Sequence, residues 1–229
     1  MRQFAVIGLG RFGQKLAMDL ASRGAEVIAI DKNRDIIEMI ADQISHAVHL
    51  DSTDEDALKA QDIDKVDVAV VSIGQGTGQG FESAVLTVVN LRQMGVKQIY
   101  ARAENPMAGQ VFSKIGATDV IYPEIESATR WAYKLLTPQI SEKMDIVPGY
   151  ILARIKAPRS FDKQTVMDLQ LRQKYNVNLV LIKRGKHGKT KKAENEEIVN
   201  VPTPDTVIYE GDILMIAGAE SDLTKLPQE

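Results

Sequence analysis

The sequence predicts an α/β protein, in which a Rossmann-like, doubly wound parallel sheet is followed by a small α+β domain. The chain opens on a short apolar run that enters a glycine-rich turn and leaves it in a helical pattern. Up to residue 122, six apolar runs alternate with helical segments, as in a parallel sheet with helices on both faces. From about residue 145 the pattern changes, and we place the domains at 1–143 and 144–229.

Composition limits the possible classes of function. With 229 residues, 44% of them hydrophobic, the chain can build one large domain or two modest ones. The net charge of −3 gives no reason to expect a nucleic-acid partner. The absence of cysteine excludes disulfides, thiol catalysis and zinc–thiolate sites. No apolar run approaches the roughly 18 residues of a membrane span, and a strand begins at once, so we expect a cytoplasmic protein that reaches a membrane only through a partner.

The N-terminal segment carries a dinucleotide fingerprint. The strand Gln3–Ile7 leads into the motif Gly8-Leu9-Gly10-Arg11-Phe12-Gly13, and a helical pattern follows. Gly8 permits a tight turn, Gly10 lets a pyrophosphate approach the backbone, and Gly13 lets the helix pack closely on the sheet. The helix N-terminus offers N–H groups and a partial positive charge to phosphates. With its flanking elements, this motif predicts a nucleotide site rather than a turn that binds nothing.

Two charged residues refine the expected ligand. Asp31 ends the second predicted strand, where a carboxylate can accept hydrogen bonds from ribose hydroxyls. Its charge would repel a 2′-phosphate, which argues against NADP. Arg11, inside the fingerprint, adds a cation beside the phosphates and would suit a di- or triphosphate.

The other elements of the first domain follow in order. Ser52 or Thr53 is the predicted N-cap of the third helix. The near-continuous apolar run at 66–73 predicts a central strand buried on both faces. The remaining predicted elements are a helix around 36–40, a strand at 46–50, a helix at 82–94, a strand at 98–103, a helix at 106–115 and a strand at 119–122.

Acidic residues follow three of the strands. Asp31, Asp51 and Glu124 stand at the carboxyl ends, where open α/β sheets bind ligands. Asp51 with Thr53 could frame an adenine, or Thr53 could only cap the next helix. Glu124 could meet a second ribose or, with a phosphate oxygen, coordinate a hard cation such as Mg²⁺.

A glycine-rich segment, Gly74-Gln75-Gly76-Thr77-Gly78-Gln79-Gly80, follows the fourth strand. It could be a flexible lid over the nucleotide or a surface loop without contacts. It is not a P-loop, because no Gly-Lys-Ser/Thr follows it.

A connecting helix is predicted at 124–140, ended near Thr137 by Pro138. Trp131 and Tyr133 lie off its apolar stripe and indicate a second buried surface, which is either a subunit interface or the second domain of the same chain. The stripe itself comprises Ile125, Ala128, Ala132, Leu135, Leu136 and Ile140.

The second domain is predicted to contain strands at Tyr150–Lys156, 179–183 and 213–217, a helix at 166–175, a turn at Glu210-Gly211-Asp212 and a charged loop at 183–197.

No catalytic machinery is visible in either domain. A dehydrogenase needs a proton donor or acceptor beside the nicotinamide. His46 and His49 point to opposite faces of one strand, and His187 stands in the charged loop. We therefore predict that the protein is not an enzyme.

Together these motifs resemble the regulator-of-K⁺-conductance family (RCK, or KTN). The N-terminal motifs are Phe4-Ala5-Val6-Ile7-Gly8-Leu9-Gly10-Arg11-Phe12-Gly13, Ile30-Asp31, Asp51-Ser52-Thr53, Ala101-Arg102-Ala103 and Ile121-Tyr122-Pro123-Glu124. The C-terminal ones are Met167-Asp168-Leu169, Arg172-Gln173-Lys174-Tyr175 and Glu210-Gly211-Asp212-Ile213-Leu214. The length of the chain and the order of its domains are similar to those of the single-RCK cytosolic subunits of bacterial Ktr/Trk potassium uptake systems. These subunits end in an RCK C-terminal (TrkA-C) domain.

The resemblance implies a regulatory subunit. Such subunits form dimers, and the dimers form an octameric ring that gates a membrane K⁺-translocating subunit at the inner face of the cell membrane. ATP or ADP, or NAD(H) in some relatives, binds the N-terminal domain and changes the shape of the ring. In several relatives cyclic di-AMP binds the paired C-terminal domains.

The resemblance also assigns residues by motif position. It implies that Arg11 contacts the terminal phosphates, Asp31 the ribose, and Glu124 a cation or phosphate near the dimer contact. The nucleotide site is expected to comprise Gly8, Gly10, Arg11, Phe12, Gly13, Asp31, Lys32, Asp51, Ser52, Thr53, Ile73, Gly74, Arg102 and Glu124. The cyclic di-AMP site would include Leu171, Arg172 and Asn178.

Two other functions stay open at this point. A small NAD-dependent oxidoreductase would require a proton-transfer residue near the nicotinamide and turnover of a reduced cofactor. The ligand-binding part of a ligand-gated K⁺ channel would require a pore segment in addition to this chain.

Overall fold

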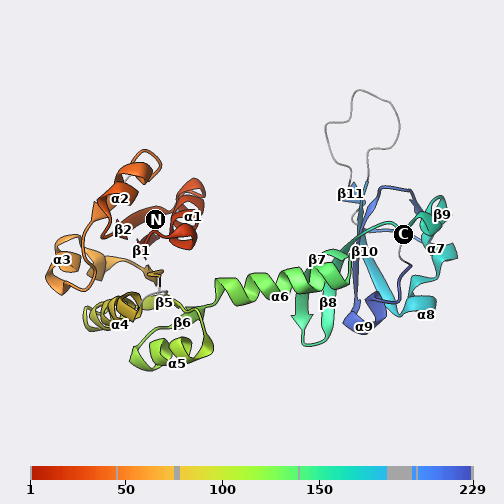
Figure 1. The fold of residues 1–229 in the computed structure, drawn as a ribbon. Helices are drawn as coiled ribbons and strands as arrows, with labels where there is room; N and C mark the ends of the chain where they lie inside the picture. Colours follow the sequence, from red (N-terminus) through yellow and green to blue (C-terminus); the bar gives the residue numbers. More distant parts are fainter. Residues whose placement is uncertain are drawn as a thin grey trace. The chain divides into compact units, whose positions relative to one another are not determined.

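The computed structural model describes residues 2–44, 46–74, 78–138, 140–184, 198–199 and 201–227 (Figure 1). The chain forms two compact units, Met1–Ser127 and Ala128–Glu229. Residues 75–77 of the glycine-rich segment and most of the predicted charged loop, including His187, lie outside the described residues.

The first unit is built on a six-stranded sheet in the order β3-β2-β1-β4-β5-β6. All neighbouring strands run parallel, which confirms the predicted Rossmann-like sheet. The strands are β1 (Gln3–Ile7), β2 (Glu26–Asp31), β3 (His46–His49), β4 (Val68–Val71), β5 (Gln98–Arg102) and β6 (Asp119–Ile121). The helices are α1 (Arg11–Ser22), α2 (Arg34–Ile40), α3 (Glu55–Ala60), the 3₁₀ turn η1 (Ile63–Lys65), α4 (Gly78–Gln93) and α5 (Pro106–Ile115).

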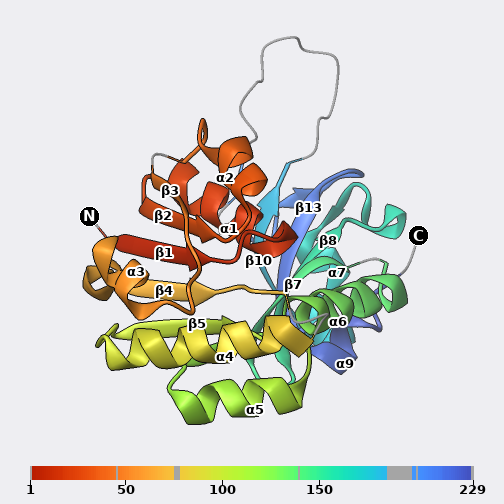
Figure 2. The same ribbon diagram turned by 60° about the vertical axis from the view of Figure 1, so that its left-hand side comes forward.

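Helices cover both faces of this sheet (Figure 2). Ala5 and Ile7 of β1 face the apolar layer to which α3, α4 and α5 contribute, whereas Val6 faces the layer of α1 and α2. All three side chains are buried. Because successive side chains of a strand point to opposite faces, this short apolar run supports two cores at once.

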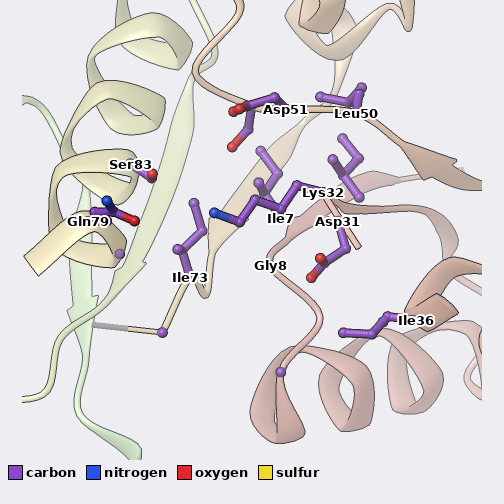
Figure 3. Close-up of a pocket in the computed structure, with 15 residues that line it drawn as sticks. Ile7, Gly8, Asp31, Lys32, Ile36, Leu50, Asp51, Ile73, Gln79 and Ser83 are labelled. Carbon is purple, nitrogen blue, oxygen red and sulfur yellow. The ribbon is translucent and has the colours of Figure 1, made fainter. Parts of the chain in front are cut away.

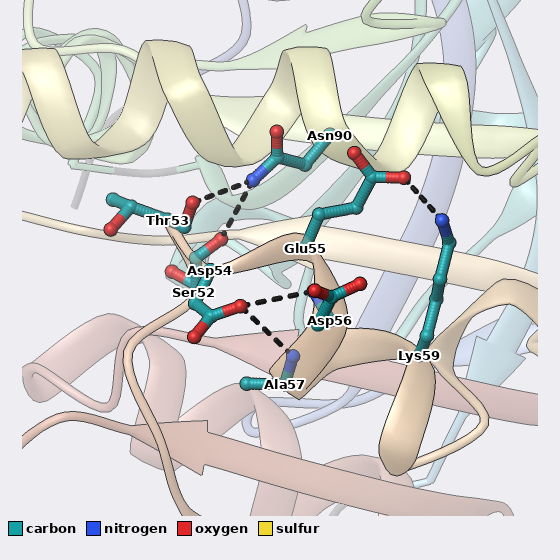
Figure 4. A network of polar contacts seen from close by, with 8 residues as sticks. All are labelled: Ser52, Thr53, Asp54, Glu55, Asp56, Ala57, Lys59 and Asn90. Carbon is teal, nitrogen blue, oxygen red and sulfur yellow. Dashed lines mark hydrogen bonds and ion pairs between the residues drawn. The ribbon is translucent and has the colours of Figure 1, made fainter.

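Two predictions at the ends of helices in the first unit were wrong. The N-cap of α3 is Asp54, whose carboxylate accepts hydrogen bonds from Asp56 N and Ala57 N at 3.0 and 3.1 Å (Figure 4). A carboxylate is a strong cap because it also meets the positive end of the helix dipole. Helix α4 begins at Gly78 rather than at residue 82. The low helix propensity of glycine concealed this first turn in the sequence.

The second unit contains a five-stranded antiparallel sheet in the order β11-β10-β13-β8-β7 and a two-stranded sheet of β12 and β9. With its short helices it is the α+β domain that the sequence predicts. The strands are β7 (Ile140–Val147), β8 (Tyr150–Lys156), β9 (Gln164–Thr165), β10 (Val177–Lys183), β11 (Ile198–Val199), β12 (Val207–Ile208) and β13 (Ile213–Ala219). The helical segments are η2 (Arg159–Phe161), α7 (Val166–Leu169), α8 (Leu171–Tyr175) and α9 (Glu220–Leu223).

Three features of the second unit depart from prediction. Strand β7 occupies the segment that was read as the end of the connecting helix and the domain junction. All its side chains after Ile140 are exposed, so it has no apolar alternation to read. The helix expected at 166–175 is broken at Gln170, where the backbone is left-handed with φ 47°. Helix α9 was not predicted.

The connecting helix α6 (Pro123–Leu136) buries no side chain. All residues of its predicted apolar stripe except Ile140 are exposed, most strongly Leu135 (75%) and Leu136 (81%). Ile140 is buried and belongs to β7 rather than to this helix. Tyr133 packs against the apolar cluster of the second unit, so its buried surface comes from the chain itself, whereas Trp131 is 51% exposed. No helix in the described part of the chain is long and apolar enough to cross a membrane.

Candidate functional site

A pocket of about 330 Å³ opens at the carboxyl ends of the strands in the first unit (Figure 3). This is the edge at which open α/β sheets bind ligands. Its lining comes from the ends of β1, β2 and β4, the segment after β3, and the starts of α2 and α4: Ile7, Gly8, Gly10, Ile30, Asp31, Lys32, Ile36, Leu50, Asp51, Ser52, Ile73, Gly74, Gln79, Gly80 and Ser83.

The three fingerprint glycines have different surroundings. Gly8 has a positive φ of 88°, and a Cβ there would lie 2.7 Å from Ile73 N. A Cβ on Gly13 would lie 2.0 Å from the carbonyl oxygen of Gly8. Because Gly13 has no side chain, α1 can pack directly against the turn. Apart from Gly10 and its two chain neighbours, no atom of the described residues lies within 4 Å of the position of a Cβ on Gly10, and Gly10 lines the pocket. The turn therefore presents open backbone to a ligand at one position only of the three.

Asp31 fastens the fingerprint to the end of β2. Its Oδ2 accepts a hydrogen bond of 2.6 Å from Leu9 N, and its Oδ1 accepts one of 2.8 Å from Asn33 N. Asn33 in turn caps α2 by accepting from Asp35 N at 2.9 Å. These bonds fix the carboxylate at the pocket wall, where ribose hydroxyls could still donate to its remaining lone pairs.

Lys32 and Asp51 are the charged groups beyond Asp31. The Lys32 side chain extends into the pocket (Figure 3). Asp51 Oδ1 accepts from Thr53 N at 3.0 Å and from Thr53 Oγ1 at 2.8 Å. These two bonds, aided by the charge of Lys32, lower the pKa of Asp51 below its ordinary value. Asp51 is therefore an ionised acceptor at neutral pH.

The segment 51–54 is held against α4 by polar contacts (Figure 4). Asn90 Nδ2 donates to Thr53 O at 3.0 Å and to Ser52 O at 3.4 Å. In addition, the hydroxyl oxygens of Ser52 and of Thr87, which also belongs to α4, lie 2.7 Å apart. Helix α4 therefore positions the segment that carries Asp51.

Glu124 and Arg102 form an ion pair outside the pocket lining. Arg102 Nη2 lies 2.6 Å from Glu124 Oε1, and the Glu124 side chain is 61% exposed. Burial opposes ionisation, but the hydrogen bond and charge of Arg102 prevail and lower the pKa of Glu124. In the described part of the chain, no group of three or more His, Asp or Glu side chains could hold a metal ion.

The pocket brings together a subset of the residues expected at the nucleotide site. These are Gly8, Gly10, Asp31, Lys32, Asp51, Ser52, Ile73 and Gly74. Arg11, Phe12, Gly13, Thr53, Arg102 and Glu124 are not part of its lining. Arg11 is exposed on the first turn of α1, next to Gly10.

The predicted site residues did not include seven residues of the apolar and α4 walls: Ile7, Ile30, Ile36, Leu50, Gln79, Gly80 and Ser83. Of these, Gln79 and Gly80 belong to the glycine-rich segment that was considered as a lid over the nucleotide. Position at the end of a strand would have indicated Ile7, Ile30 and Leu50. The residues expected to bind cyclic di-AMP lie in the second unit. There Leu171 is buried in the core, Arg172 is exposed on α8, and Asn178 is half-buried on β10.

Comparison with known proteins settles the family. Residues 4–123 match the TrkA-N domain, and residues 150–227 match the TrkA-C domain. The chain belongs to the TrkA-N and TrkA-C domain family. It is 34% identical to Ktr system potassium uptake protein C of Bacillus subtilis over 98% of this chain and 95% of the relative. It is 31% identical to Ktr system potassium uptake protein A of the same organism over 100% and 96%.

Solved structures show the same fold for this TrkA-N and TrkA-C chain. The structure of the GsuK channel matches with a TM-score of 0.63 and 17% identity, over 98% of this chain and 38% of that one. The chain thus spans less than half of the length of that solved protein. At this identity the match indicates shared architecture alone.

Proposed function

We propose that this protein is a nucleotide-sensing regulatory subunit that gates a membrane K⁺-translocating subunit. The observation that carries the proposal is the pocket, in which the open backbone of Gly10 and the carboxylate of Asp31 face one space in a relative of Ktr potassium uptake proteins. The protein would act from the cytoplasm and reach the membrane through its partner. Both relatives are named as potassium uptake proteins of a Ktr system, which supports a role in K⁺ uptake.

The residues of the pocket fit an adenine nucleotide. A volume of about 330 Å³ lies in the usual range of small-ligand sites. The open backbone at Gly10 and the N-terminus of α1 suit phosphates, and Asp31 suits a ribose. The apolar side chains of Ile36, Leu50 and Ile73 suit a base. ATP and ADP are the proposed ligands, with NAD(H) as the alternative and a cation at Glu124 as an optional addition.

The direct test is calorimetric titration with ATP, ADP, NAD⁺ and NADH, combined with measurement of the oligomer mass. Preference for ATP in an octamer supports the regulatory ring. Tight NADH binding by a lone dimer, with turnover of the cofactor, would favour the NAD-dependent oxidoreductase instead.

Arg11 is the proposed sensor of the terminal phosphate. It stands at the first position of α1, one residue after the open Gly10. A nucleotide can drive a change of shape only by binding one state more tightly than the other. The γ-phosphate, which ADP lacks, would supply that difference through a charge-assisted bond to this guanidinium, in the same or a neighbouring subunit.

Arg11→Ala is expected to weaken ATP binding by about tenfold or more and to change ADP binding much less, because a hydrogen bond to a charged group contributes about 1.5–3 kcal/mol. The measurement is direct titration with both nucleotides. Lys15→Ala is the matched control, because Lys15 is a cation one turn further along α1 that pairs with Asp19 at 2.6 Å. An unchanged ratio of ATP to ADP affinity would contradict the role of Arg11.

The exposed stripe of α6 is the proposed contact between copies of the chain. It presents the apolar residues Ile125, Ala128, Ala132, Leu135 and Leu136 to solvent on a helix that buries none of them. A contiguous apolar surface of this kind on a soluble protein marks an interaction site. The family resemblance favours a second copy as the occupant, with dimers assembled into an octamer.

Replacing both Leu135 and Leu136 with glutamate is expected to shift the assembly to a smaller species without unfolding it, since both side chains are exposed. The reason is that carboxylates would be buried unpaired at the contact. Light scattering coupled to size exclusion gives the mass. Met39→Glu, at an exposed methionine of α2, is the control that should leave the mass unchanged. If the double variant keeps the full mass, the stripe is not the contact.

A further inference from the structure

The segment that carries Asp51 is tied to α4 through a chain of buried hydroxyls. Ser52 and Thr87, 6% and 0% exposed, lie with their hydroxyl oxygens 2.7 Å apart. Thr87 Oγ1 donates its one proton to Ser83 O at 2.8 Å. Ser52 must therefore be the donor to Thr87. The direction of the whole chain, from Ser52 to Thr87 to Ser83 O, is fixed.

This chain joins two walls of the pocket. Ser52 and Ser83 both line it, one beside Asp51 and the other on the first turns of α4. Asn90 adds a second tie, from its side-chain amide to the carbonyl oxygens of Ser52 and Thr53 (Figure 4). The backbone on the C-terminal side of Asp51 is thus held at several points by one rigid helix.

The carboxylate of Asp51 faces the pocket as an acceptor. Its Oδ1 is occupied by the backbone and hydroxyl of Thr53, whereas no described residue donates to Oδ2. An ionised carboxylate can only accept hydrogen bonds. A ligand edge that meets Asp51 must therefore donate.

We propose, on the basis of the proposed nucleotide site, that Thr87 and Asn90 are positioning residues that hold Asp51 opposite C6 of the base, where it selects a purine with a 6-amino group. Adenine presents such a donor, whereas guanine presents an oxo group at C6 and has its amino group at C2. A carboxylate opposite that oxo group leaves two acceptors unpaired in a desolvated contact, which rejects the base.

The test is titration of the full chain with ATP and GTP. The unmodified protein is expected to prefer ATP by about 5- to 150-fold, which is the effect of one good base contact. Asp51→Asn, whose amide can donate to an oxo group, should bring the ratio towards one. Thr87→Val keeps the shape but removes the acceptor of the Ser52 hydroxyl, so it should lower the ATP to GTP ratio and leave the ATP to ADP ratio unchanged. Thr87→Ser should restore the preference.

Thr137→Val is the matched control. Thr137 makes the same bond to the carbonyl four residues earlier, at 2.7 Å to Tyr133 O, but belongs to the second unit. It should leave the ATP to GTP ratio unchanged. Binding of GTP as tightly as ATP, or more tightly, by the unmodified protein would overturn the base selection while leaving the regulatory function standing. A full ATP preference in a folded Thr87→Val variant would overturn the positioning role. Failure of every adenine nucleotide to bind would overturn the proposed function itself.

Discussion

Gly13→Ala is expected to lower the free energy of unfolding of the first unit by about 3 kcal/mol, the upper end of the usual cost of overpacking, because the site is enclosed by backbone atoms. The new Cβ would lie 2.0 Å from the carbonyl oxygen and 3.2 Å from the carbonyl carbon of Gly8. Neither atom belongs to a flexible side chain, so the clash is relieved only if α1 moves off β1. That movement would expose Ala17, which is fully buried under the sheet. Urea denaturation followed by circular dichroism measures the loss.

Gly10→Ala is the matched control for the glycine variant. Among the described residues other than its chain neighbours, no atom lies within 4 Å of the position of the new Cβ, and the φ of −65° at Gly10 suits any residue. We expect a stability change of about 1 kcal/mol at most. Nucleotide affinity should nevertheless fall, since the methyl group enters the space where the backbone meets phosphate. A Gly13→Ala variant that unfolds at the urea concentration of the unmodified protein would contradict the close packing at Gly13.

The sequence alone predicted different roles for Gly10 and Gly13, and the structure gives these two glycines different surroundings. The parallel sheet, the fingerprint and Asp31 were predictable because each follows from residues close together in the chain. Asp51 was predictable as a site residue from topology, because the carboxyl ends of parallel strands lie at the same edge of the sheet, where ligands bind. Its location in the pocket lining needed no knowledge of packing.

Contacts between distant segments were not predictable in the same way. The bond between Ser52 and Thr87 joins residues 35 positions apart and depends on which face α4 turns towards the segment after β3. The first turn of α4 was not predicted because it contains two glycines, Gly78 and Gly80, which have low helix propensity. Strand β7 was not predicted because it lies at the edge of its sheet and its side chains after Ile140 are exposed. Such a strand pairs through its backbone and needs no alternation of apolar and polar side chains.

The turn before β13 contains a buried ion pair in the second unit. Asp212 is fully buried, and its Oδ2 accepts from Arg184 Nη1 at 2.7 Å and from Tyr209 N at 3.0 Å. Arg184 Nη1 also donates to Val207 O at 2.8 Å, and the guanidinium lies 5.5 Å from the centre of the Tyr209 ring. The carboxylate therefore joins the end of β10 to the turn that starts β13. When it is intact, such a pair stabilises the fold little more than apolar residues of similar volume would. Removal of one partner leaves the other charge buried and unpaired, which is strongly destabilising.

Asp212→Ala is accordingly expected to destabilise the second unit by about 3–5 kcal/mol. Urea denaturation gives the total loss, and amide hydrogen exchange in β8, β10 and β13 assigns it to this unit. Glu142→Ala is the matched control, because the Glu142 side chain is 71% exposed and its carboxylate also pairs with an arginine, Arg154, at 3.2 Å. An exposed pair should change stability by about 1 kcal/mol or less, since water replaces the lost partner. If both variants lose the same small amount, the Arg184–Asp212 pair is solvated, and β10 and β13 are held by their backbone ladder and apolar packing alone.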